Sequence, residues 1–266
     1  MILKPLYAVM ERELLRTLRQ RSRLLAALVR PLIWLFIIGA GFGAAFDSDE
    51  LHYQSYLVPG VVGMTLLFGA MLAALSLVHD KESGVMRMLV IAPFAHHWIV
   101  LAKMLSAALA ALLQALLLLV LLALLGRLDA RIDWSMLALA LVVCALTCSG
   151  IGVLTAAFSK TLENFASVMN FIIFPVFFLS GALYAVGHLP LALRIAARIN
   201  PFTHGVDLLK HAMLVPLGAP AAAEFSVATD LLYTLGFTLL ALAAASWRFS
   251  QESRYEPLIY ALAGRR

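Results

Sequence analysis

The residues of this chain whose types could do chemistry are few and lie far apart. The histidines able to bind a metal are the pairs His96–His97 and His204/His211, and neither has a cysteine or a cluster of acids near it in the sequence. Cys144 and Cys148 lie one helical turn apart in an apolar run, which favours small buried side chains over a thiol or metal pair. We therefore expect no catalytic residues, no metal ligands and no cofactor bound by this chain.

The composition indicates that the chain folds in a lipid bilayer. Of 266 residues, 63% are hydrophobic and only 13% are charged, whereas a soluble domain has about 45–50% apolar and about 25% charged residues. A span needs about 20 apolar residues, and six runs approach this length, near 31–46, 56–78, 99–125, 135–158, 165–184 and 228–247. The net charge of +5 fits topology and lipid headgroups, so we expect no nucleic-acid partner.

The apolar runs carry no evident source of energy and no evident catalytic site. No G-x-x-x-x-G-K-[ST] phosphate loop occurs, and the glycines of 39–43 suit close helix packing instead. Ser149–Gly150 could serve an intramembrane protease, but no histidine at the centre of a span matches it. The main polar groups inside the spans include Gln114 and Asn170, whereas an ion-coupled carrier usually needs buried acids or histidines.

The first 30 residues predict an amphipathic helix at the membrane surface. Apolar side chains recur at helical spacing on one side and arginines on the other. Such a helix lies in the headgroup layer with its apolar side in the acyl boundary. It is either an anchor beside the first span or a lever that also contacts a cytoplasmic partner, and both can hold. The basic side consists of Arg12, Arg16, Arg19 and Arg23.

The positions of Lys and Arg predict that both termini are cytoplasmic. With six spans and the N-terminus inside, 15 of the 20 Lys and Arg residues fall in inner segments and five in outer ones. Lys and Arg are enriched in cytoplasmic loops. The stretch 79–98 (HDKESGVMRMLVIAPFAHHW) is then an inner loop between the second and third spans.

The loop 79–98 is the most compact segment that a soluble partner could contact. Gly84 allows the chain to break before a short helix, and Pro93 ends that helix. Its apolar side chains either lie on the membrane surface or insert into the groove of a partner, where methionine adapts well. We interpret this loop as the place where a separate ATPase delivers mechanical work.

The segment 185–227 predicts two short helices on the outer side. Residues 188–199 and 201–215 look helical, but each is too short to cross about 30 Å of hydrocarbon. Asn200 and Pro201 form a cap followed by a first turn, and Asp207 is placed for local ion pairing with Lys210 and His211. The helices either enter the outer leaflet and return, lining an exit path, or form a cap that seals the bundle.

Three stretches carry a resemblance to a known family. Glu82–Met86 through Pro93 resembles an E-x-G-T-[LM] segment that runs to a proline, and Phe178–Tyr184 followed by Leu189–Pro190 resembles an S-G motif. Asn200–Lys210 resembles the signature N-P-[LF]-T-Y-x-[VI]-[DE]-x-[LI]-R. In this order they are similar to the ABC-2 type permeases, the membrane subunits of bacterial ABC exporters. The chain departs from the family pattern at Val85, Ala185, His204 and Lys210.

The resemblance implies an all-α membrane protein with an amphipathic connecting helix (1–30) and a six-span transmembrane domain (31–266). It implies a coupling loop at 79–98, two re-entrant outer helices between spans 5 and 6 (185–227), and a location in the bacterial inner membrane. Its implied partners are a second copy of the permease and two copies of a separate ATP-binding subunit, which holds ATP and Mg. The residues it assigns to ATPase coupling are Glu82, Gly84, Met86, Arg87, Leu89 and Pro93. Those it assigns to the outer helices and gating are Ser180, Gly181, Tyr184, Asn200, Pro201, Phe202, His204, Asp207 and Lys210.

Three functions are held in parallel. The first is a permease subunit, not itself an enzyme, that exports a hydrophobic or amphipathic substrate (a drug, lipid or lipid-linked glycan) with a partner ATPase. The second is a secondary carrier or channel that needs no ATP. The third is a membrane enzyme or scaffold whose turnover would depend on Ser149.

Overall fold

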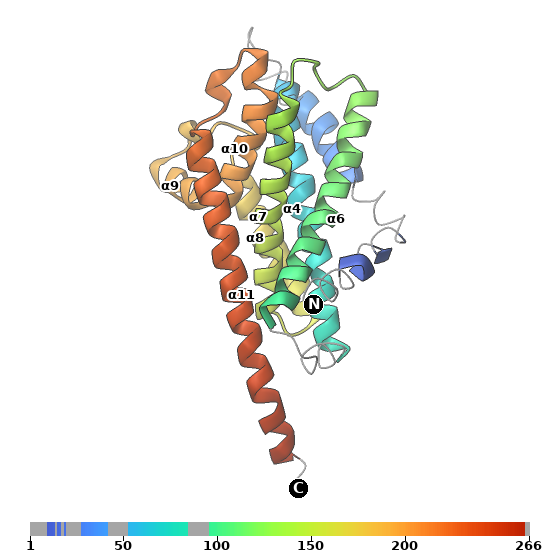
Figure 1. Cartoon of the computed structure of the whole chain (residues 1–266). Helices are drawn as coiled ribbons and strands as arrows, with labels where there is room; N and C mark the ends of the chain where they lie inside the picture. The colour runs from blue at the N-terminus through green and yellow to red at the C-terminus, as the bar shows by residue number, and fades with distance from the viewer. Residues whose placement is uncertain are drawn as a thin grey trace.

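The computed structural model describes residues 10–13, 15–16, 19, 28–41, 53–84 and 96–263, with side chains described as far as residue 251. These residues form helices and the turns between them, with no strand in any of the described ranges. The all-α prediction is confirmed for this part of the chain. Figure 1 shows an elongated bundle, in which the C-terminal end of α4 lies toward one end and α9 and α10 lie toward the other.

Among the residues that the structure describes, four helices are long and apolar enough to cross a membrane. They are α4 (Tyr53–Glu82), α6 (His96–Leu124), α7 (Trp134–Phe158) and α11 (Val227–Ala263). At 1.5 Å per residue, α7, with 25 residues, spans about 38 Å. The helix Leu28–Gly41, which contains a π-helical turn η1 (Trp34–Ile38), and α8 (Leu162–Phe178) are apolar but shorter. The six-span count therefore stays a prediction.

The helix boundaries differ from the predicted spans at several places. α4 continues to Glu82 and α6 begins at His96, so the predicted inner loop is partly helical. α8 ends at Phe178, six residues before the predicted end of the fifth span. Two short helices lie where the sequence predicted them, α9 (Leu191–Ile199) and α10 (Pro201–Met213), flanked by the 3-10 turns η2 (Val186–His188), η3 (Val215–Leu217) and η4 (Pro220–Ala222). Their re-entrant placement on the outer side stays a prediction.

Small residues let α7 pack closely at the centre of the bundle. A Cβ on Gly152 of α7 would lie 3.0 Å from Ala74 Cβ and 3.2 Å from the Ala70 carbonyl oxygen of α4. A Cβ on Gly205 of α10 would lie 2.8 Å from the sulfur of Cys144. Cys144 and Cys148 are both buried and unbridged, which confirms their interpretation as small packing residues. Close backbone approach of this kind is the usual basis of helix association in lipid.

Candidate functional site

The end of the bundle at which α4 ends and α6 begins holds a cluster of four charged side chains, three of them buried. Lys103 of α6 donates to Glu13 Oε1 at 2.7 Å and pairs with Asp80 of α4. Arg12 donates to Glu13 Oε1 and to Asp80 Oδ2, both at 2.7 Å. Glu13, Asp80 and Lys103 are each less than a tenth exposed. The cluster therefore fixes residues 12–13 to α4 and α6.

The electrostatics of the cluster favour its charged forms. Burial alone would raise the pKa of Glu13, but the charge and hydrogen bond of Lys103, together with Arg12, outweigh it and lower that pKa. Burial likewise opposes the charge of Arg12, yet Glu13 and Asp80 raise the pKa of its guanidinium above the ordinary value. Glu13 is therefore ionised and Arg12 protonated near neutral pH.

Two residues at the end of α4 bind the turn between α7 and α8. Lys81 Nζ donates to the carbonyl oxygens of Ala156 (3.3 Å) and Ala157 (2.8 Å), which are among the last carbonyls of α7. Glu82 Oε2 accepts the backbone N–H of Leu162, the first residue of α8, at 3.4 Å. The carboxylate of Glu82 thus lies at a helix N-terminus, where negative charge is favoured.

Gly84 ends this part of the structure with a φ of +75°, a conformation that glycine adopts readily. Its predicted role as a chain break is thereby supported. The other residues assigned to coupling, Met86, Arg87, Leu89 and Pro93, lie outside the described residues. Of the four arginines predicted to form the basic side of an N-terminal helix, Arg12, Arg16 and Arg19 are among the described residues and Arg23 is not. The amphipathic helix itself stays a prediction.

The S-G motif forms a tight turn after α8. Ser180 Oγ donates to the Phe177 carbonyl at 2.6 Å and accepts the Ala182 N–H at 3.3 Å. Gly181 has a φ of +74°. Tyr184 donates its hydroxyl to the Phe178 carbonyl at 2.6 Å, closing the same turn. This local bonding stops the helix although the sequence stays apolar.

The start of α10 is capped as the sequence predicted. Asn200 Oδ1 accepts the N–H of Phe202 at 3.1 Å, and Pro201 occupies the first position of the helix. Asn200 also donates its amide to the Val176 carbonyl of α8 at 2.7 Å. Asn200 therefore both caps the start of α10 and ties it to α8. Phe202, which follows the cap, is fully buried.

Lys210 has a different partner from the one the sequence suggested. Its buried Nζ donates to the Tyr56 hydroxyl at 2.8 Å and lies 4.8 Å from the centre of that ring. Tyr56 in turn donates to the Gly181 carbonyl at 3.1 Å. Two resemblance motifs, 178–184 and 200–210, therefore meet at one residue of α4. Tyr56 was not a predicted site residue.

Asp207 binds backbone groups that come after α10. Its carboxylate accepts the N–H of Glu224, at 3.0 Å to each oxygen, and the N–H of Phe225 at 2.9 Å. His211, one of its two expected partners, lies 3.9 Å away. Asp207 thus fixes the segment that leads from η4 into α11.

His204 lies fully buried between two oxygen atoms. Its Nδ1 is 2.8 Å from Asp230 Oδ1, and its Nε2 is 2.9 Å from the Arg198 carbonyl. The ring stacks on Tyr233, with centroids 4.3 Å apart. The histidine that replaces the usual tyrosine of the signature thus connects α10 to the first turn of α11.

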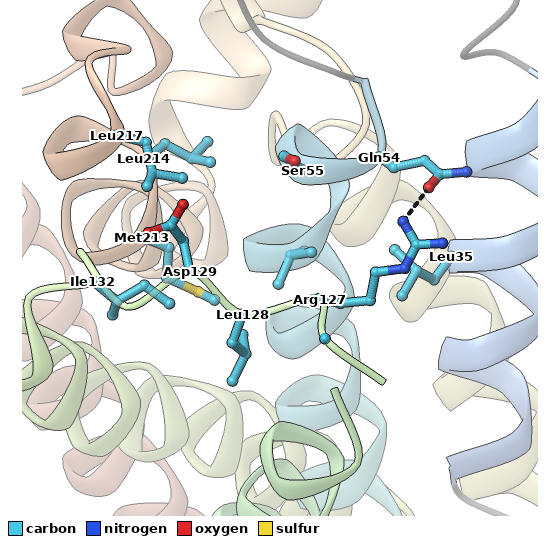
Figure 2. Close-up of a pocket in the computed structure, with 12 residues that line it drawn as sticks. Leu35, Gln54, Ser55, Arg127, Leu128, Asp129, Ile132, Met213, Leu214 and Leu217 are labelled. Atoms are coloured by element: carbon cyan, nitrogen blue, oxygen red, sulfur yellow. Dashed lines mark hydrogen bonds between the residues drawn. The ribbon is translucent and has the colours of Figure 1, made fainter. Parts of the chain in front are cut away.

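A cavity of about 250 Å³ opens beside these outer elements. Figure 2 shows Arg127, from the loop between α6 and α7, directed toward Gln54 of α4, and the two are joined by a 2.7 Å hydrogen bond. Asp129 and Ser55 add further polar groups, and the end of α10 and η3 supply an apolar side. The cavity is lined by Leu35, Gln54, Ser55, Val58, Gly126, Arg127, Leu128, Asp129, Ile132, Met213, Leu214 and Leu217.

Comparison with known proteins identifies the family. The family description "ABC-2 type transporter" matches residues 5–214, which is most of the chain. The chain belongs to the ABC-2 type transporter family. It is 30% identical over 199 residues to nodulation protein J of Rhizobium leguminosarum bv. trifolii, covering 73% of this chain and 74% of that protein.

Other relatives are named as transport permeases. The chain is 25% identical over 216 residues to the putative transport permease ycf38 of Porphyra purpurea, covering 79% of this chain and 74% of that one. It is 23% identical over 206 residues to the inner membrane transport permease YadH of Escherichia coli K12, covering 75% of this chain and 80% of that protein. The resemblance read from the three motifs is therefore correct, and the chain is a membrane permease subunit.

Within this ABC-2 permease, sequence reasoning missed the residues that join distant segments. Glu13, Asp80, Lys103, Tyr56 and Asp230 were not among the predicted site residues. A signal existed for three of them, because Asp80, Lys103 and Asp230 are charged residues within long apolar helices, and such residues need partners. The identity of those partners depends on the fold.

Proposed function

We propose that this chain is the membrane subunit of an ATP-driven exporter, which moves a hydrophobic or amphipathic substrate out of the cytoplasm or the inner leaflet. Two copies assemble with two copies of a separate ATP-binding subunit in a bacterial inner membrane, with both termini in the cytoplasm. The chain itself is not an enzyme, and ATP and Mg bind the partner. Membership of the ABC-2 family carries this proposal.

The placement of buried charge supports an external energy source. Among the described residues of the four long helices, the buried acids and bases are Asp80, Lys103 and Asp230. Each lies within eight residues of a helix end. An ion-coupled carrier usually places such groups near the middle of its spans, so this distribution favours coupling to a partner.

The architecture of the inner end supports a route for that coupling. Lys81 and Glu82, in the last turn of α4, bind the α7–α8 turn, and the charged cluster holds residues 12–13 against α4 and α6. A push on the loop that follows Gly84 would therefore reach α4, α7 and α8 together. Close-packed helices transmit such displacements as rigid bodies.

The outer helix α9 supports the proposal that this segment contacts lipid or a second copy. Leu191, Ile195 and Ile199 recur every fourth residue and are between 50% and 71% exposed. Residues at this spacing share one face of a helix. An apolar face of this kind is suited to the outer leaflet or to the partner permease.

A reconstitution experiment tests the proposal. The chain and its ATP-binding partner are placed in liposomes, separately and together, and ATP hydrolysis and efflux of a fluorescent amphipath are measured. We expect ATP-dependent efflux only with both subunits. Removing Glu82 (Glu82→Ala) should uncouple hydrolysis from efflux while the complex still assembles, and Glu163→Ala, at the exposed start of α8, is the matched control. Efflux by the chain alone without nucleotide would support the secondary carrier or channel instead.

A further inference from the structure

Three side chains at the outer end form a cluster that the proposed function does not use. Asp207 and His211 lie four residues apart on α10, and Asp230 lies in the first turn of α11. His211 Nε2 is 3.9 Å from Asp207 Oδ2 and 3.9 Å from Asp230 Oδ2. One ligand atom from each of the three lies within 4.8 Å of the other two.

Asp230 supplies an independent sign that something binds there. The residue is fully buried, and its Oδ2 has no hydrogen-bond partner among the described residues. A buried carboxylate oxygen without a partner is costly to fold. The other oxygen, Oδ1, is held by His204 at 2.8 Å, so the carboxylate is fixed in orientation with Oδ2 on the side of His211.

The charge around the cluster also calls for a cation. Asp207 and Asp230 place two carboxylates beside His211. A third acid, Glu224, follows closely in the chain: its backbone N–H binds Asp207, and its carboxylate accepts the N–H of Val186. The basic groups nearby are Lys210, whose Nζ donates to the Tyr56 hydroxyl, and the two histidines His204 and His211. A divalent cation would balance the excess negative charge and give Asp230 Oδ2 its missing partner.

We propose that Asp207, His211 and Asp230 bind one divalent transition-metal ion, of the Zn²⁺ or Mn²⁺ type. An ion near their centre would lie about 2.5 Å or less from each ligand atom, and a small contraction gives ordinary bond lengths. One imidazole with two carboxylates suits these metals better than Mg²⁺ or Ca²⁺, which prefer oxygen ligands alone.

The hydrogen bonds around the cluster are compatible with the metal. His211 Nε2 donates to the Phe225 carbonyl at 2.8 Å. On binding, the metal replaces that proton, the imidazole proton moves to Nδ1, and the Phe225 oxygen becomes available as a fourth ligand. His204 remains outside the ligand set and orients Asp230. Carboxylates that bind metals are commonly held by such a hydrogen bond from a second residue.

This site was not expected from the sequence, because no acid cluster adjoins His211 there. Asp230 reaches it from 19 residues further along the chain, beyond the residues that the family description matches. A metal held by both α10 and α11 would join the outer helix pair to the last span. The site is independent of the proposed transport function.

Metal analysis of the full-length permease tests the proposal. The protein is purified in detergent without a histidine tag, treated with EDTA, dialysed, and titrated with Zn²⁺, Mn²⁺, Mg²⁺ and Ca²⁺ separately. We expect about one Zn²⁺ or Mn²⁺ per chain, a melting temperature that rises with either ion and falls with EDTA, and weaker binding of Mg²⁺ and Ca²⁺.

Variants separate this site from adventitious binding. His211→Gln should abolish binding, and its side chain is one-fifth exposed, so the variant should fold even if Asp230→Asn does not. His204→Gln should weaken affinity about 10- to 100-fold. His188→Gln, at an exposed histidine of η2, is the control and should bind as the original chain does. Failure to bind one ion per chain, or equal binding by His211→Gln, would overturn the proposal.

Discussion

Replacing Lys103 by methionine should expose how strongly the inner charged cluster holds the bundle together. Methionine retains an unbranched apolar side chain of nearly the same length and removes the charge. Lys103 is 2% exposed, and Asp80 and Glu13 are 4% and 8% exposed at their side chains. After the change, Asp80 keeps only Arg12 as a described basic partner, and the Arg12 side chain is 46% exposed.

The expected cost of Lys103→Met is large. Breaking a buried ion pair by removing one partner costs about 3–5 kcal/mol, because the other charge stays buried without compensation. For a protein of this size, that loss lowers the melting temperature by about 6–20 °C. Adding Asp80→Asn to Lys103→Met removes the stranded charge, so the double variant should be more stable than the single one.

Thermal unfolding of the detergent-purified proteins measures these differences. Arg131→Met is the matched control, because Arg131 pairs with Asp129 at 3.1 Å in an exposed loop, and its loss should leave the melting temperature unchanged. If Lys103→Met melts with the original protein, or if Asp80→Asn makes it worse, the buried cluster is not what fixes the N-terminal helix to α4 and α6.

Four further changes have defined outcomes. Gly60→Ala should prevent the packing of α4 against the turn that contains Ala182, because the new Cβ would overlap the Ala182 carbonyl oxygen. Gly236→Ala, with open space around it, should fold normally. Size-exclusion chromatography of the purified variants compares their folded states. Asn200→Ala should cost about 1–3 kcal/mol by removing a helix cap and leaving the Val176 carbonyl without its donor, and an unchanged melting temperature would contradict this. The pKa of Glu13 is lower in the folded protein than in the unfolded chain. Its ionised form therefore stabilises the fold fully above the unfolded-state pKa of about 4.3, and this contribution is lost as the pH falls through the folded-state pKa. At pH values below about 4, the melting temperature should decrease in the original protein and decrease less in Glu13→Gln. In Gly84→Ala the new Cβ contacts no other atom, but alanine at a positive φ is strained. The variant should therefore reduce ATPase coupling without reducing the amount of folded protein. Partner-stimulated ATP hydrolysis and the yield of purified protein measure these two effects.

Features set by local sequence could be predicted, and several are confirmed. The long apolar runs gave α4, α6, α7 and α11, and the Asn200–Pro201 pair gave the start of α10, because a cap and a fixed proline φ act within one turn. The prediction for the end of the fifth span was wrong. Apolar composition continues through Tyr184, but the Ser180 hydroxyl and the positive φ of Gly181 close a turn that hydropathy does not register.

Features set by contact between distant residues could not be predicted. Lys103 meets Glu13 across 90 positions and Lys210 meets Tyr56 across 154. No periodicity links such pairs, since their meeting depends on how the helices pack. Lys210 is an example. Its spacing from Asp207 within one helix predicted an ion pair between them, but α4 packs close to α10 and Lys210 donates to Tyr56 of α4 instead.

The pairing of Asp80 with Lys103 bears on how the protein enters the membrane. These residues lie on α4 and α6, which are joined by the inner loop, so their charges meet within one helical hairpin. A hairpin that neutralises its own charges can leave the insertion machinery as a unit, at less cost than two helices released singly. Arg12 and Glu13 are synthesised first yet find their partners only after this hairpin is in place, so docking of the N-terminal helix reports that α4 and α6 have been correctly inserted.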